Sequence, residues 1–180
     1  MNKKRIIILV SGLVLLGVVI FIIISSCKNG NIVSTVNKNS ELPVEYMIKQ
    51  ESFKDEDKYQ KINNYMSNDY YNNDIKFSFY GYPNDESEFY LGSIELFTSK
   101  YNILGVKVGD NLEKSISKIE NYGFKRTDKG ENNYNVTLTK DDYTIVINGE
   151  LTIYSDDKEE EEVGSIKISA KSEYLGNRIY

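Results

Sequence analysis

The chain of 180 residues contains no histidine, no tryptophan, two prolines and a single cysteine. The missing histidine excludes Ser-His-Asp and Cys-His nucleophile systems, because both need an imidazole base. It also excludes HExxH zinc sites and His/Cys zinc clusters. Glycine-rich phosphate loops, EF-hand spacing and G-x-S-x-G elbows are absent from the sequence as well. We therefore expect neither catalysis nor a cofactor, although a pair of carboxylates acting as acid and base stays open.

Positive charge is scarce in most of the chain. All 27 acidic residues lie beyond residue 27, together with only 19 of the 22 basic residues, which leaves a net charge of about −8 there. An acidic surface repels phosphate groups, so we expect no binding of nucleic acid. Solubility alone explains this charge more simply than an acidic docking role does.

The longest apolar run extends from Ile6 to Ile24 and contains neither charge nor proline. As a helix, its 19 or so residues reach roughly 28 Å, which matches the hydrocarbon core of a bilayer. Lys3, Lys4 and Arg5 precede the run, so the positive-inside rule places the N-terminus in the cytoplasm and residues 28–180 outside. We therefore predict a bacterial cell-envelope protein attached to the cell membrane through residues 6–24.

Two fates are open for this segment. It persists as a transmembrane signal anchor, or it is a signal peptide that is removed before Cys27. The second alternative rests on Ile24-Ser25-Ser26-Cys27, which is similar to the lipobox of bacterial lipoproteins and makes Cys27 the lipidation candidate. Because Cys27 is the only cysteine, no disulfide can stabilise the rest of the chain.

The sequence divides into three parts: residues 1–27, the anchor or lipoprotein signal peptide; residues 28–43, a polar segment; and residues 44–180, an extracytoplasmic domain. The polar segment is rich in Asn and Ser and shows no periodicity, so we interpret it as a flexible tether. Within the domain, helical spacing predicts a helix in Val44–Met66. The Asn-rich stretch after it contains Tyr70 and Tyr71, which we expect to cover a small core with their hydroxyls in water rather than to form a contact site.

Alternating apolar residues predict a β-hairpin next, with one strand around Ile75–Phe79 and its partner in Phe89–Thr98. A helix is then expected over residues 111–122, with Asp110 and Glu113 as a capping box and Gly123 as a left-handed terminator. Its apolar face contains Leu112, Ile116 and Ile119, and Phe124 should fold back onto the core.

A meander of four antiparallel strands is predicted after Gly130 from the alternation of its apolar residues. These are Val136 and Leu138; Tyr143, Ile145 and Ile147; Leu151 and Ile153; and Ile166, Ile168 and Ala170. The dipeptide Asn148-Gly149 is typical of a two-residue turn, but that register would set apolar residues opposite polar ones. We therefore favour a three-residue loop over residues 148–150, or a bulge.

Two loops are rich in carboxylates, at residues 84–88 and 156–162. Either could bind calcium or another divalent cation, and the second could bind a basic partner. Neither has a defined ligand spacing, so the simpler interpretation is a solvated loop.

The motif Gly105-Val-Lys-Val-Gly-Asp110, followed by a short helix, Tyr122-Gly-Phe124 and a meander, resembles the repeat of β-lactamase-inhibitor-protein-like domains, which also occurs in small outer-membrane assembly lipoproteins. The resemblance covers about residues 103–171. It implies a helix packed on a four-stranded antiparallel sheet and the binding of protein partners. A cystatin-like helix-on-sheet fold is the second alternative.

We thus predict an α+β fold, with one or two helices packed on an antiparallel sheet of about six strands. The predicted function is a membrane-anchored extracytoplasmic interaction module that binds a protein partner of the cell envelope and does not catalyse a reaction. The alternatives are a carboxylate-based hydrolase acting on envelope glycans and a calcium- or ligand-sensing domain.

The mass of the intact protein extracted from its membrane distinguishes the two fates of the N-terminal segment. A retained span predicts the mass of the full chain, whereas a lipoprotein predicts a chain that begins at Cys27 and carries acyl groups. A full-length mass would contradict lipidation of Cys27.

Overall fold

The computed structural model describes residues 31–81, 89–127, 134–154 and 159–171. The predicted span at residues 6–24, the lipidation candidate Cys27 and the 84–88 loop all lie outside these ranges. Within them, no helix has the length and apolar character needed to cross a membrane.

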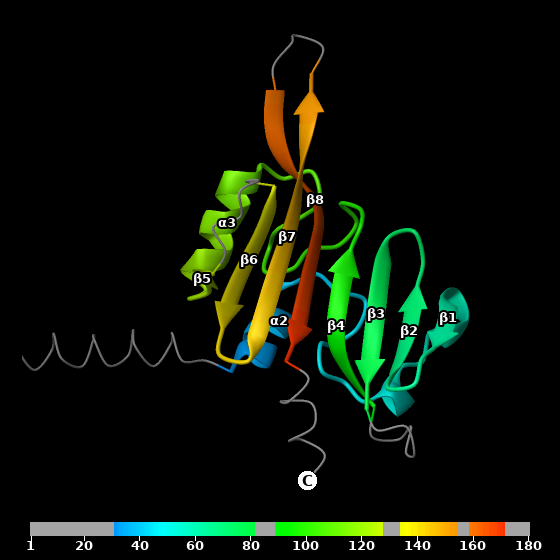
Figure 1. The fold of residues 1–180 in the computed structure, drawn as a ribbon. Helices are drawn as coiled ribbons and strands as arrows, with labels where there is room; N and C mark the ends of the chain where they lie inside the picture. The colour runs from blue at the N-terminus through cyan, green and yellow to red at the C-terminus, as the bar shows by residue number, and fades with distance from the viewer. Residues whose placement is uncertain (1–30, 82–88, 128–133, 155–158, 172–180) are drawn as a thin grey trace, which may run out of the picture. The chain divides into compact units, whose positions relative to one another are not determined.

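Eight antiparallel strands form one sheet in the described part of the chain (Figure 1), in the order β1-β2-β3-β4-β8-β7-β6-β5. Strands β1 to β4 form one meander and β5 to β8 a second, and the pairing of β4 with β8 joins them. The strands are β1 (Gln60–Asn63), β2 (Ser67–Tyr71), β3 (Ile75–Tyr80), β4 (Tyr90–Leu96), β5 (Lys125–Arg126), β6 (Asn135–Lys140), β7 (Tyr143–Ile153) and β8 (Glu159–Ala170).

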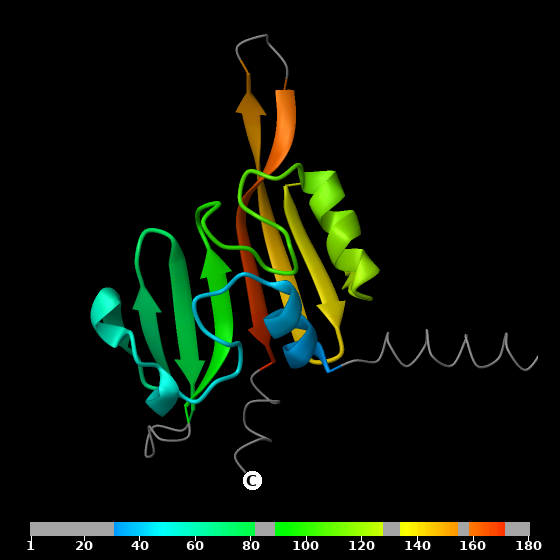
Figure 2. The ribbon, with the colours of Figure 1, turned by 180° about the vertical axis from the view of Figure 1, so that it is seen from behind.

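Two α-helices, α2 (Ile32–Asn39) and α3 (Leu112–Asn121), lie on the same face of the sheet, as the view from behind shows (Figure 2). Two short 3-10 turns, η1 (Gln50–Ser52) and η2 (Glu56–Lys58), precede β1. Each meander therefore follows one α-helix in the chain. The core lies between the sheet and the segments that cover this face.

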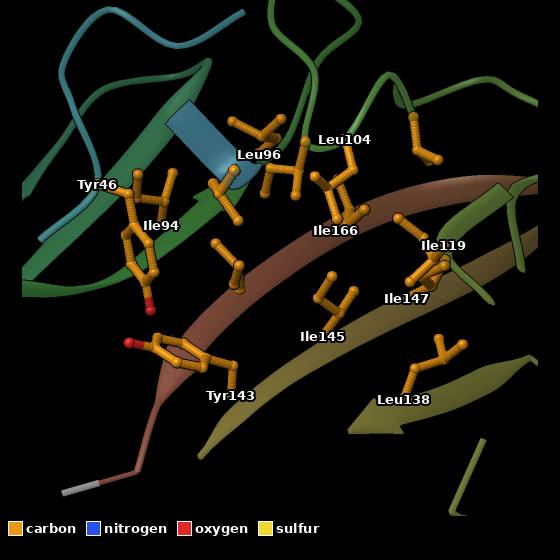
Figure 3. Close-up of a cluster of buried hydrophobic side chains, with 14 of the residues drawn as sticks. Tyr46, Ile94, Leu96, Leu104, Ile119, Leu138, Tyr143, Ile145, Ile147 and Ile166 are labelled. Carbon is orange, nitrogen blue, oxygen red and sulfur yellow. The ribbon is translucent and has the colours of Figure 1, made fainter. Parts of the chain in front are cut away.

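The centre of the core is the join between the two meanders (Figure 3). Ile94 pairs with Ile168 and Leu96 pairs with Ile166 across it, and all four side chains are fully buried. Tyr46 and Tyr143 meet edge to face nearby, with ring centroids 6.2 Å apart.

The α+β prediction with about six strands was wrong, because the sheet has eight strands and the structure is predominantly β. Three short strands, β1, β2 and β5, were not foreseen, and two predicted strands are parts of the single strand β7. Short strands with few apolar residues give no clear alternation, so their pairing depends on neighbours that the local sequence does not reveal.

The helix predicted in Val44–Met66 is not present. This segment forms irregular structure, the two 3-10 turns and β1. Ile62 and Met66, two of the residues that suggested helical spacing, are about half exposed. Phe53 is buried instead, and its ring centroid lies 5.1–5.6 Å from those of four other aromatic residues: Tyr59, Tyr70, Phe77 and Phe79.

Tyr70 is fully buried, contrary to the expectation that its hydroxyl is in water. The hydroxyl accepts a hydrogen bond from Nε2 of Gln50 at 3.0 Å, and Oε1 of Gln50 accepts one from Nδ2 of Asn68, also at 3.0 Å. Burial raises the pKa of Tyr70. The Gln50 amide thus links two polar side chains of β2 that point into the core.

Part of the predicted tether is ordered, since residues 32–39 form α2. Ile32 and Val36 of this helix are buried in the core. Asn37 joins the helix to the next segment, because its Oδ1 accepts a hydrogen bond from the backbone N–H of Tyr46 at 2.7 Å.

Helix α3 confirms the helix predicted at residues 111–122, with a different cap. Oδ1 of Asn111 accepts a hydrogen bond from the backbone N–H of Lys114, while Asp110 accepts one from Lys107 instead. Gly123 has the predicted positive φ of 89°, and Phe124 is buried as expected.

The β3–β4 hairpin is also confirmed. The three-residue loop favoured at residues 148–150 is wrong, because β7 continues through these residues. The register of β7 with β8 shifts between Asn148 and Gly149, so a bulge lies there rather than a reversal. A Cβ atom at Gly149 would lie 2.8 Å from Cδ2 of Leu112, which shows how closely α3 packs on this point.

We predict that Gln50→Leu destabilises the domain by about 1–3 kcal/mol, because the buried amide of Asn68 and hydroxyl of Tyr70 would lose their partner. Urea unfolding measures the change. The exposed Gln60 offers the matched control, and Gln60→Leu should leave the midpoint nearly unchanged. Adding Asn68→Leu and Tyr70→Phe should recover part of the loss, and no recovery would contradict this account.

Candidate interaction surface

The hairpin of β7 and β8 extends beyond the rest of the sheet (Figure 1). Strand β6 pairs with β7 only as far as Asn148, and β4 pairs with β8 only from Ile166 to Ser169. Gly149–Ile153 and Glu159–Val163 therefore pair chiefly with each other. We call this two-stranded ribbon the arm.

The root of the arm is held firmly. The backbone N–H of Gly109 donates to the carbonyl of Val163, and the N–H of Val163 donates to the carbonyl of Asp110, both at 2.8 Å. On the other edge, the N–H of Gly149 donates to the carbonyl of Tyr134. Three backbone hydrogen bonds and the packing of α3 thus hold the base of the arm in place.

One face of the arm combines apolar and acidic side chains. Leu151 lies opposite Glu161 and Ile153 lies opposite Glu159, and directly opposed residues of an antiparallel pair share a face. The side chains of Leu151 and Ile153 are 44% and 66% exposed. The same register places Gly149 opposite the buried Val163, so this face continues the side of the sheet on which α3 packs.

The opposite face is acidic and hydrogen-bonded. Glu150 lies opposite Glu162, and Thr152 lies opposite Glu160. The carboxylate of Glu162 accepts hydrogen bonds from the hydroxyls of Thr152, at 3.0 Å, and of Tyr154. The bond to Glu162 raises the pKa of Tyr154.

The cross-strand side-chain pairs of the arm contribute little to its stability. Like charges directly opposed are destabilising, as in the Glu150–Glu162 pair, and apolar side chains gain little against carboxylates. Within the sheet the same two strands pair Ile145 with Ile168 and Ile147 with Ile166. An isolated two-stranded ribbon is marginal in water, so a partner that covered Leu151 and Ile153 and neutralised the acids would stabilise it.

The acidic run at residues 156–162, which we interpreted as a solvated loop with a cation or partner site as the alternative, is not a single loop. Glu159–Glu162 belong to β8, whereas residues 156–158 lie outside the described ranges. In the described part of the chain, no three acidic side chains are grouped so as to hold a metal ion. The acids were identified from the sequence but the arm was missed, because a chain reversal was placed at residues 148–150 and Leu151 and Ile153 were assigned to the apolar face of a separate strand.

A polar depression of about 500 Å³ lies near the turn between β2 and β3, lined by Asp57, Lys58, Tyr59, Gln60, Tyr71, Asn72, Asn73 and Asp74. Oδ2 of Asp74 accepts a hydrogen bond from Nζ of Lys100 at 2.8 Å, and its Oδ1 accepts one from Thr98. The bond from Lys100 lowers the pKa of Asp74. A glycosidase acid needs the opposite shift, so Asp74 is suited to an ion pair rather than to proton donation.

A scan of protein-family models and searches of curated proteins and of solved structures found no match to this chain.

We predict that Asp74→Asn lowers thermal stability more at pH 7 than at pH 2.5. The pKa of Asp74 is lower in the folded protein than the roughly 3.9 of an unfolded chain. The ionised carboxylate therefore adds to the free energy of unfolding at pH values above the unfolded pKa, and this stabilisation is lost as the pH falls through the folded pKa. Thermal melts at the two pH values measure the difference. Asp141→Asn, at an exposed residue, is the control, and an equal loss at both pH values would contradict the prediction.

Proposed function

We propose that this chain is a membrane-attached extracytoplasmic interaction module that contacts a protein partner of the cell envelope and performs no catalysis. The observation that carries the proposal is the exposure of Leu151 and Ile153 on a projecting, well-rooted arm. A monomer gains nothing by placing two large aliphatic side chains side by side in water, whereas burying them in a complex would be favourable.

Membrane attachment is part of the proposal and rests on the sequence. Residues 6–24 would span the bilayer with the N-terminus in the cytoplasm, or lipidation of Cys27 would anchor the domain. Both arrangements place the described domain outside the cell membrane.

The arm is favoured over the other exposed apolar residues by its construction. Ile62, Tyr65 and Met66 are also exposed, but Ile62 belongs to the four-residue strand β1, and Tyr65 and Met66 lie in the tight turn between β1 and β2. The arm presents a longer surface, with strand edges that β6 and β4 do not cover and with Leu151 and Ile153 exposed on one face. The glycan-hydrolase alternative has weaker support, because Asp74, which lines the polar depression, is held as an ionised carboxylate by Lys100.

Photo-crosslinking in the native membrane tests the proposal. A photoreactive residue at position 153 should give one discrete protein adduct, and the same residue at Lys118, exposed on α3, should give none. Leu151→Thr should weaken the adduct while leaving the thermal melt nearly unchanged, because Leu151 is not part of the core and threonine adds no charge opposite Glu161. Equal adducts from both positions, or no adduct from the arm, would contradict the proposal.

A further inference from the structure

We infer that the partner contributes an extended segment with alternating basic and aliphatic side chains, which adds as a strand to the β7 edge of the arm. This inference rests on the proposed function and deepens it, because it names the chemistry and the docking mode of the partner. Strand addition to an open sheet edge is a recurrent mode of peptide recognition.

The hydrogen-bonding pattern of β7 identifies the groups that would receive the strand. The N–H of Gly149 points away from β8, because it donates to the carbonyl of Tyr134 in the chain leading into β6. Backbone direction alternates along an antiparallel strand, so the N–H and C=O groups of Leu151 and Ile153 point to the same outer edge. Beyond Asn148, β6 no longer pairs with this edge of β7. An added strand would lie beside Gly149–Ile153 in line with β6, which pairs with residues 143–148 of the same edge.

The side chains along this edge determine the pattern of the partner. Residues of the added strand on the face of Leu151 and Ile153 would lie directly beside these two side chains, which separate them from the acids of β8 on the same face, so aliphatic side chains fit there. Residues on the opposite face would lie beside Glu150 and Thr152, with the acidic strand β8 one position further away. Lysine or arginine on that face would offset the repulsion between Glu150 and Glu162.

Charge complementarity also selects among the possible occupants. A second copy of this chain adding its own arm would bring more carboxylates next to Glu150, which is unfavourable. Nucleic acid and anionic lipid surfaces would be repelled by the same residues. A cationic, alternating protein segment is therefore the occupant that both the charge and the apolar side chains favour.

Binding of labelled peptides to the full chain in detergent micelles tests the inference. The probe is a nonapeptide in which lysine or arginine alternates with valine or isoleucine. One comparison peptide has the same composition with its basic and apolar residues in two blocks, and another carries N-methyl groups on alternate backbone nitrogens. We expect the alternating peptide to bind at least about tenfold more tightly than either comparison peptide, because only it can pair with the edge and match both faces.

Variants of the protein locate the site. Leu151→Thr combined with Ile153→Thr should weaken binding roughly tenfold, as expected for loss of two buried aliphatic contacts. Glu150→Gln should weaken binding at low salt and reduce its salt dependence. Ile62→Thr, a matched exposed substitution in β1, should change nothing, and thermal melts confirm that each variant folds.

Equal binding of the alternating and block peptides, or binding unaffected by the arm variants, would overturn the inference. Binding that appears only after residues 128–133 are shortened would also overturn it, by assigning the edge to that segment of this chain. The two proposals fail separately. If position 153 crosslinks a protein but no cationic peptide binds, the interaction module stands and the cationic strand does not.

Discussion

The pairing of β4 with β8 is the contact on which the rest of the structure depends. Only four residues of each strand take part, yet they join two meanders whose members are otherwise neighbours in sequence. Ile94, Leu96, Ile166 and Ile168 are fully buried at this join. Because α3 and strands β5 to β7 lie between β4 and β8 in the chain, the pairing closes a long loop, and the burial of its side chains must offset the entropy of closure. Disulfides provide no alternative, since the chain has a single cysteine.

The same join explains where the arm begins. Strand β8 pairs with β4 only from Ile166 to Ser169, and β7 pairs with β6 only as far as Asn148. Both strands continue beyond these points. Strands β4 and β6 thus end before the arm, whereas β7 and β8 extend past them as a two-stranded ribbon. The loop before α3 braces the pair at Val163, and Leu112 packs against Gly149. The part of the two strands that extends past β4 and β6 is the surface that we propose contacts a partner, and its like-charged and mixed cross-strand pairs add little to the stability of the fold.

Prediction from the sequence succeeded where periodicity and burial agree. Helix α3 has three buried aliphatic residues at helical spacing and a glycine stop, and the β3–β4 hairpin has clear alternation. It failed in residues 44–66, where Phe53 packs against aromatic residues of β2 and β3 and the buried side chains do not recur at helical spacing. It also failed at residues 148–150, where the expected loop is replaced by continuous pairing of β7 with β8 and, as far as Asn148, with β6. The acids of the arm were visible in the sequence, but their relation to Leu151 and Ile153 was not.

The sequence by itself determined the exclusion of histidine chemistry, the acidic charge, the absence of disulfides and the local identity of α3 and of the β3–β4 hairpin. These properties depend on composition or on residues within one or two turns of each other. The tertiary structure decided the order of the eight strands, the burial of Tyr70 against Gln50 and the projection of the arm. Each of these depends on contacts between residues far apart in the chain, and a single sequence carries no local signal for such contacts.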